Sequence, residues 1–229
     1  RTPDQELWIG EGVFFGLGCN IKFPSDFTYA PYTIIATGVD TLPQKLLFPF
    51  SLINSPSQVI DEISPAYNEI FPAWILSNNI FMIKRNEGKY IKRNKAKRTK
   101  FVFEVFRPEI INMMIFARKK LQVKSTKEIW TDRDIAGLGK NYMCEDVRKT
   151  GIEAYTFYIR YYALLGLKKK LEYFVSVGAK NKIKTILKDK TNDTRWEHER
   201  KILILEFTSN TIIHNLELLA EMQKKIARD

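Results

Sequence analysis

Positively charged side chains are concentrated between Lys84 and Lys100. This stretch carries nine Lys and Arg residues against a single acid, Glu87, so it contributes +8 to the formal net charge of +11. Guanidinium and ammonium groups bind phosphate oxygens, and an interleaved aromatic ring offers a face on which a base can stack. The sequence therefore predicts a site for a phosphate-bearing ligand, which could be a nucleotide, coenzyme A or a nucleic acid. The residues assigned to this site are Arg85, Lys89, Tyr90, Lys92 and Arg93.

The same run of charge is also typical of a solvated surface loop, and the sequence leaves that alternative open. No catalytic residue can be assigned, so whether the chain is an enzyme is not decided. His198 has charged neighbours on both sides and is expected on a solvated helix face, and His214 is expected to pack or cap locally in the last helix and not to act as a base. No cluster with the spacing of metal ligands stands out, and no metal is predicted.

A six-residue period runs through the first forty residues. When residues 9 to 39 are written in rows of six, the rows begin with Ile9, Phe15, Ile21, Phe27, Thr33 and Val39. This register is typical of a left-handed parallel β-helix, in which each rung forms one side of a triangular coil and the leading side chain points into the core. An ordinary glycine-rich loop and hairpin over residues 10–18 is the alternative.

The period stops after residue 40. Prolines and apolar groups follow, and helical spacing returns over 108–122, with further helices expected over about 145–165, 167–176, 179–189 and 193–227. Gly166 is expected to end the second of these helices, and the last is expected to break near Ser209 and Asn210. The predicted fold class is mixed β and α. It consists of the end of a left-handed parallel β-helix (1–40), an irregular, extended Pro-rich and basic connector packed on it (41–106), and an α-helical bundle (107–229).

Composition narrows the class of protein further. The chain has 229 residues, of which 45% are hydrophobic and 28% charged, and this composition is globular and not disordered. Two cysteines, Cys19 and Cys144, are too few for a disulfide framework, which favours a cytoplasmic location. No apolar run approaches the length of a membrane span, so no membrane partner is expected. Because the six-residue pattern starts almost at Arg1, we expect this chain to be the C-terminal part of a longer polypeptide.

Three segments resemble a known group of proteins. They are FTYAPYTIIATG at 27–38, LPQKLLFPFSLI at 42–53 and RNEGKYIKRN at 85–94, and together with Trp74 they are similar to the C-terminal half of a family of uncharacterised hexapeptide-repeat proteins. The likeness covers residues 9 to about 122. Members of the family resemble acyl and sugar-nucleotide transferases in their β-helix.

The resemblance implies a transferase-like protein that binds acyl-coenzyme A or a sugar nucleotide and forms a homo-oligomer, most simply a trimer. The catalytic histidine of the acyltransferases cannot be carried over, because residues 1–79 contain no histidine. The alternative function is a non-catalytic oligomeric scaffold whose basic strip binds nucleic acid or an acidic partner.

Overall fold

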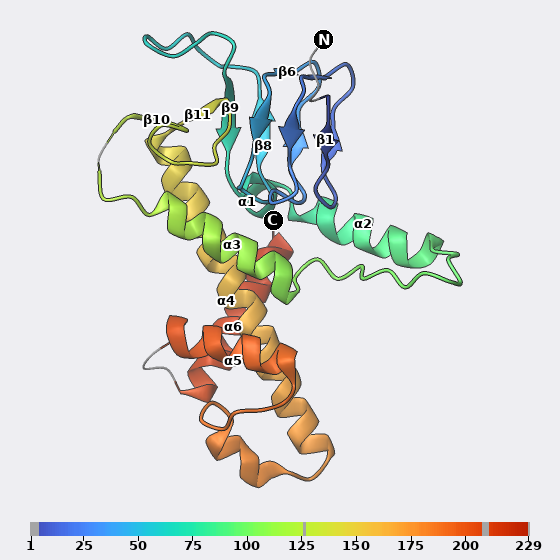
Figure 1. The fold of residues 1–229 in the computed structure, drawn as a ribbon. Helices are drawn as coiled ribbons and strands as arrows, with labels where there is room; N and C mark the ends of the chain where they lie inside the picture. Colours follow the sequence, from blue (N-terminus) through green and yellow to red (C-terminus); the bar gives the residue numbers. More distant parts are fainter. Residues whose placement is uncertain (1–4, 126, 208–210, 229) are drawn as a thin grey trace. The chain divides into compact units, whose positions relative to one another are not determined.

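The computed structural model describes residues 5–125, 127–207 and 211–228 (Figure 1). The chain forms two compact units. Unit 1 contains Arg1–Val105 and Glu109–Tyr155, and unit 2 contains Phe106–Pro108 and Thr156–Asp229. The predicted division after residues 40 and 106 stays a prediction.

Unit 1 is built from short strands in three sheets. A three-stranded parallel sheet has the order β1-β4-β7, and a two-stranded parallel sheet contains β3 and β6. The third sheet has six strands in the order β10-β11-β9-β8-β5-β2. The strands are β1 (Leu7–Trp8), β2 (Phe14–Phe15), β3 (Asn20–Ile21), β4 (Ser25–Asp26), β5 (Ile34–Ile35), β6 (Asp40–Thr41), β7 (Gln44–Lys45), β8 (Leu52–Asn54), β9 (Asn68–Phe71), β10 (Ile129–Thr131) and β11 (Asn141–Cys144).

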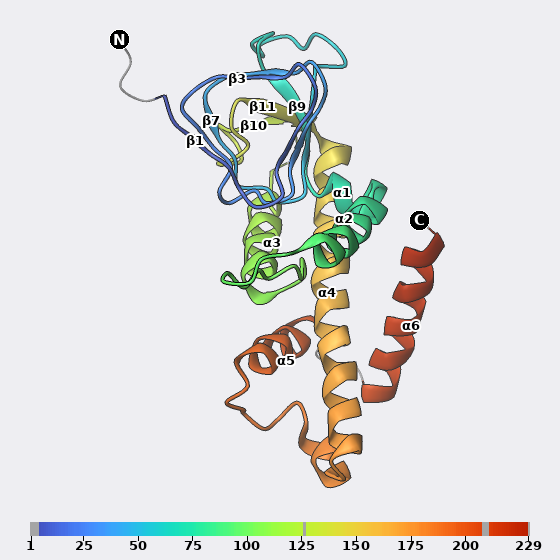
Figure 2. The same ribbon diagram turned by 90° about the vertical axis from the view of Figure 1, so that its right-hand side faces the viewer.

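From β1 to β8 the chain visits the three sheets in turn, and Figure 2 shows this path running around a common interior. Phe27, Val39 and Leu46 are fully buried there. Among the row leaders of the six-residue period, Thr33 is also fully buried, whereas Ile9 is 57% exposed. Ile9 follows β1, an edge strand of its sheet, so it has no strand on its outer side among the described residues.

The predicted fold class is wrong. The fold is mixed α/β, with short strands in parallel and mixed sheets, and the six-stranded sheet is not the end of a purely parallel β-helix. Its β8 pairs antiparallel with β9, and β10 pairs antiparallel with β11. All of these strands lie outside the predicted β region. Their pairing could not be read locally, because β11 joins the sheet by pairing Asn141 with Asn68, far back in the sequence.

The predicted irregular connector is also incorrect. Besides β7, β8 and β9, it contains two helices, α1 (Trp74–Asn78) and α2 (Ile80–Arg93). The prolines that suggested extended chain end at Pro72, and no other proline occurs before Pro108. Nothing in the intervening sequence therefore removes the backbone donors that a helix requires.

The helix predicted over 108–122 is observed as α3 (Pro108–Leu121), which buries Ile110, Met114, Ala117 and Leu121. The next helix, α4 (Glu145–Ser176), begins in unit 1 and ends in unit 2, and it passes through the predicted stop at Gly166. A Cβ on Gly166 would lie 2.2 Å from the carboxyl group of Glu199. Glycine at this position therefore makes room for the Glu199 side chain. It does not end the helix.

Unit 2 continues with a 3₁₀-helix (Lys180–Thr185), α5 (Thr194–Glu206) and α6 (Ile212–Arg228). The Asp193 side chain caps α5 by accepting a hydrogen bond from the Trp196 amide at 3.0 Å. On α6 the buried residues Asn215, Leu219, Met222 and Ile226 follow a helical spacing. The predicted break at Ser209 and Asn210 lies outside the described residues.

A charged cluster fixes the start of α4 within unit 1. The Arg148 side chain is buried and donates two hydrogen bonds of 2.7 Å to the Glu145 carboxylate. The Trp130 indole donates to the same carboxylate at 2.7 Å, and Arg148 also donates to the carbonyl of Leu121 at the end of α3. These contacts join α3, α4 and β10.

The cluster predicts a specific dependence of stability on pH. Hydrogen bonds from Arg148, and then from Trp130, lower the pKa of Glu145 from 4.5 to about 2. The ionised carboxylate therefore stabilises the fold fully above pH 4.5, and this contribution is lost as the pH falls toward 2. We expect the melting temperature of the native chain to exceed that of Glu145→Gln by a constant margin above pH 5, and the margin to shrink below pH 4. A margin independent of pH would contradict the assignment.

Candidate functional site

The predicted phosphate-binding residues lie on α2, which forms an arm together with the segment that follows it. We call residues 80–105 the basic arm. Ile80 and Ile83 are buried and anchor the helix, and the Glu87 carboxylate accepts a hydrogen bond from the Val105 amide at 3.4 Å. This contact brings the returning segment alongside α2, as Figure 1 shows.

Four of the five predicted residues share one face of α2. At about 100° per residue, Arg85, Lys89, Lys92 and Arg93 fall within an arc of about 100°. The arc lies on the opposite side of the helix from the buried Ile80. The structure therefore brings these four cations together as a solvent-facing stripe.

The remaining cations of the stretch are exposed as well, outside the stripe. Lys84 is exposed on α2, and Lys95, Lys97, Arg98 and Lys100 are exposed in the segment after it. None of the nine cations has a carboxylate within ion-pair distance in the part of the chain that the structure describes. Their charge is thus not neutralised by the arm or by its neighbours.

Tyr90, the fifth predicted residue, borders the stripe. It stands three residues before Arg93, about 60° away around the helix. Its ring stacks on Phe103 with a centroid distance of 6.2 Å and an interplanar angle of 9°, and the residue is still 62% exposed. One face of the ring is therefore engaged within the arm, and much of the ring is open to solvent.

Sequence reasoning missed two aromatic residues of the arm. The ring centroids of Phe103 and Phe101 are 6.0 Å apart, and the two rings continue the row that begins at Tyr90. Their alternate spacing and their position after the charge run were visible in the sequence. The stacking of Phe103 on Tyr90 could not be predicted from the sequence, because it depends on the chain turning back along α2.

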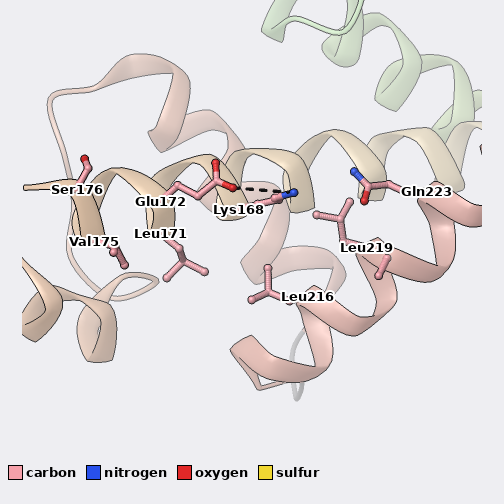
Figure 3. A pocket seen from close by; sticks show the side chains of 9 residues that line it. Lys168, Leu171, Glu172, Val175, Ser176, Leu216, Leu219 and Gln223 are labelled. Atoms are coloured by element: carbon pink, nitrogen blue, oxygen red, sulfur yellow. Dashed lines mark ion pairs between the residues drawn. The ribbon is translucent and has the colours of Figure 1, made fainter.

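Unit 2 contains an apolar groove of about 550 Å³ between α4 and α6 (Figure 3). Leu171, Leu216 and Leu219 line it, and Lys168 forms an ion pair of 3.9 Å with Glu172 at its side. The groove can hold an apolar group. The Ser176 hydroxyl, also in the lining, donates a hydrogen bond of 2.8 Å to the carbonyl of Tyr173.

A second cavity, of about 420 Å³, has several charged residues in its lining and lies between α4 and α5. Its charges pair with one another: Lys170 with Asp193 at 3.2 Å, and Arg195 with Glu199 at 3.0 Å. Burial raises the pKa of Glu199, and Arg195 opposes that rise. The groups serve mainly to hold α5 against α4, because each charge already has a partner.

His198 departs from expectation. It is half-buried and its Nδ1 lies 3.2 Å from the Tyr162 hydroxyl, so it does not stand on a solvated face. The reason is that α5 turns this side toward the buried tyrosine of α4. Within the described ranges, no three metal-ligating side chains gather into a site, and none of the helices has the length and hydropathy of a membrane span.

Comparisons with known proteins give a limited result. No protein family matches the chain, and no solved structure matches it. A protein of Treponema pallidum (strain Nichols), described as "Uncharacterized protein", is 32% identical over 114 residues, which is 48% of this chain. The matched region spans 14% of that relative's length. The resemblance to hexapeptide-repeat proteins thus stays a hypothesis, and what the chain is shown to resemble is a small part of a larger protein without an assigned activity.

Proposed function

We propose that the basic arm binds the phosphate backbone of a nucleic acid. The observation that carries this proposal is the group of nine exposed cations that have no acidic partner among the described residues. Such a group can neutralise several phosphates at once and release their counterions. Of the two functions that the sequence suggested, this corresponds to the binding scaffold.

The distribution of the cations supports an extended ligand. The 14 residues of α2 span about 21 Å, and the charges continue into the loop beyond it. A duplex presents a negative charge about every 1.7 Å along its axis, so a ligand of this kind can face the entire stripe. The two cavities outlined in unit 2 include no residue of the arm.

A transferase-like role would use the same residues differently. Arg85, Lys89, Lys92 and Arg93 would then clamp the phosphates of acyl-coenzyme A or a sugar nucleotide, with Tyr90 stacking on the base. A small ligand favours cations that converge on a pocket, whereas these point outward along a helix. We therefore treat that role as the contrasting outcome of the experiment below.

The proposal predicts a change in the salt dependence of binding. The binding constant K for a labelled 20-nucleotide single strand is measured by fluorescence anisotropy at several potassium chloride concentrations. The native chain is compared with a variant in which alanine replaces Arg85, Lys89, Lys92 and Arg93. The slope of log K against log salt should become shallower by about 3, since each lost phosphate contact removes about 0.7 for a single strand. Affinity at low salt should also fall.

A matched control has four exposed lysines of unit 2, Lys180, Lys182, Lys184 and Lys188, replaced by alanine. Both variants lose four positive charges, so only their position differs. Equal effects of the two variants would mean that binding reflects net charge and not the arm. Saturable binding of acetyl-coenzyme A or a sugar nucleotide, lost in the arm variant, would replace the proposal with the transferase-like role.

A further inference from the structure

Three aromatic rings form a row on the basic arm. Tyr90 stacks on Phe103 at 6.2 Å, and Phe101 stands 6.0 Å from Phe103 on the side of the returning segment. The two outer residues are largely open to solvent, with Tyr90 62% and Phe101 55% exposed. The row therefore offers ring surface that packing within unit 1 does not use.

The row is held in place by contacts within the arm. The hydrogen bond from the Val105 amide to Glu87 ties the returning segment to α2 two residues beyond Phe103. The amide of Asn94 donates a hydrogen bond of 2.9 Å to the carbonyl of Tyr90 and closes the helix where the chain turns. A platform fixed at two points loses less conformational entropy when a ligand binds.

Exposed cations flank the aromatic residues along the chain. Arg93 follows Tyr90 by about one helical turn, and Arg98 and Lys100 precede Phe101. Aromatic rings flanked by positive charge are the combination that binds single-stranded nucleic acid, because the charges follow the backbone while unpaired bases stack on the rings. In a duplex the base faces are covered by their neighbours, so a duplex can use the cations alone.

We propose that Tyr90, Phe101 and Phe103 form a stacking platform for unpaired bases, so that the basic arm selects single-stranded over duplex nucleic acid. The inference rests on the proposed nucleic-acid binding and adds the form of the ligand. It also explains why large aromatic side chains are kept exposed beside nine charges.

The test compares a 20-nucleotide single strand with its duplex at one fixed salt concentration. Tyr90→Leu and Phe101→Leu keep apolar bulk but remove the rings. Each should weaken single-strand binding by roughly 5- to 150-fold, the loss expected for one stacked base. Duplex affinity and the salt slope should stay unchanged. Because both residues are exposed, the melting temperature should stay close to that of the native chain.

Matched controls come from the neighbouring aliphatic residues. Ile91 is 59% exposed beside Tyr90, and Val102 is 64% exposed beside Phe101. Ile91→Ala and Val102→Ala should leave single-strand binding unchanged. A 2-aminopurine base in the strand gives a direct readout, since its fluorescence should be quenched by the native chain and not by Tyr90→Leu.

The outcomes separate this inference from the proposed function. If single strand and duplex bind equally and the ring variants bind as the native chain does, the platform is refuted while the nucleic-acid proposal stands. If the native chain binds neither, both fail. If the arm instead captures an acidic peptide or an anionic vesicle and no nucleic acid, its partner belongs to a different class and the stacking role is overturned.

Discussion

Replacing Gly16 with alanine is expected to lower the free energy of unfolding by about 3 kcal/mol, near the upper end of overpacking effects. A Cβ at this position would lie 2.4 Å from the Thr37 amide nitrogen and 2.6 Å from the carbonyl carbon of Ala36. Both atoms belong to the backbone after β5, so no side-chain rotation can relieve the clash. The hydrogen bond from the Gly16 amide to the Ile35 carbonyl, at 2.8 Å, fixes that approach. Thermal or urea unfolding measures the loss.

The matched control is Gly88→Ala on α2. Apart from the adjacent residues and the backbone of the helix itself, no heavy atom lies within 4 Å of a Cβ built on Gly88. The residue is helical, so alanine should stabilise the chain by about 0.5–1 kcal/mol. The two substitutions add the same methyl group and are expected to shift the melting temperature in opposite directions. A Gly16→Ala protein as stable as the native chain would contradict the close contact between the segments after β2 and β5.

Helices were predictable where periodicity and end signals agreed. For α3, the sequence shows both a proline at the start, Pro108, and a basic last turn. The observed helix has the bounds that these two signals predict. The helix α2 was missed because only Ile80 and Ile83 are buried on it, too few apolar positions to stand out from the charge run. The predicted stop at Gly166 is wrong because the sequence cannot distinguish a glycine that turns the chain from one that makes room for Glu199.

The sheets were less accessible to sequence reasoning. A six-residue period is a local signal, and it ends before the strands that make the largest sheet mixed. The pairing of Asn141 with Asn68 and of Ile53 with Ile70 depends on contacts between distant segments that carry no common repeat. The prediction therefore ended the β region at residue 40, and it missed the later strands whose antiparallel pairing makes the sheet mixed.

The candidate site was predictable in composition but not in geometry. Counting charges was enough to select Arg85, Lys89, Lys92 and Arg93. Only their place on a helix makes them a single stripe, and only the return of the chain brings Phe103 against Tyr90. Their ligand-binding role itself stays a prediction until the binding experiments above are done.

Replacing Arg148 with methionine is expected to lower the free energy of unfolding by about 3 kcal/mol, within the range for breaking one partner of a buried ion pair. Methionine fills similar space, so the loss is electrostatic. It removes both 2.7 Å hydrogen bonds to Glu145 and leaves the Leu121 carbonyl at the end of α3 without this donor. Of its partners among the described residues, the Glu145 carboxylate then keeps the hydrogen bond from Trp130 and the more distant Lys149.

Lys149 provides the matched control, because it pairs with the same carboxylate at 3.7 Å but its side chain is 59% exposed. Lys149→Met should cost less than about 1 kcal/mol, as exposed ion pairs do. Combining Arg148→Met with Glu145→Gln should recover part of the stability, since no unpaired charge is then left against Trp130. Equal losses for Arg148→Met and Lys149→Met would show that the burial of Arg148 contributes nothing. In that case the junction of α3, α4 and β10 must be stabilised by apolar packing alone.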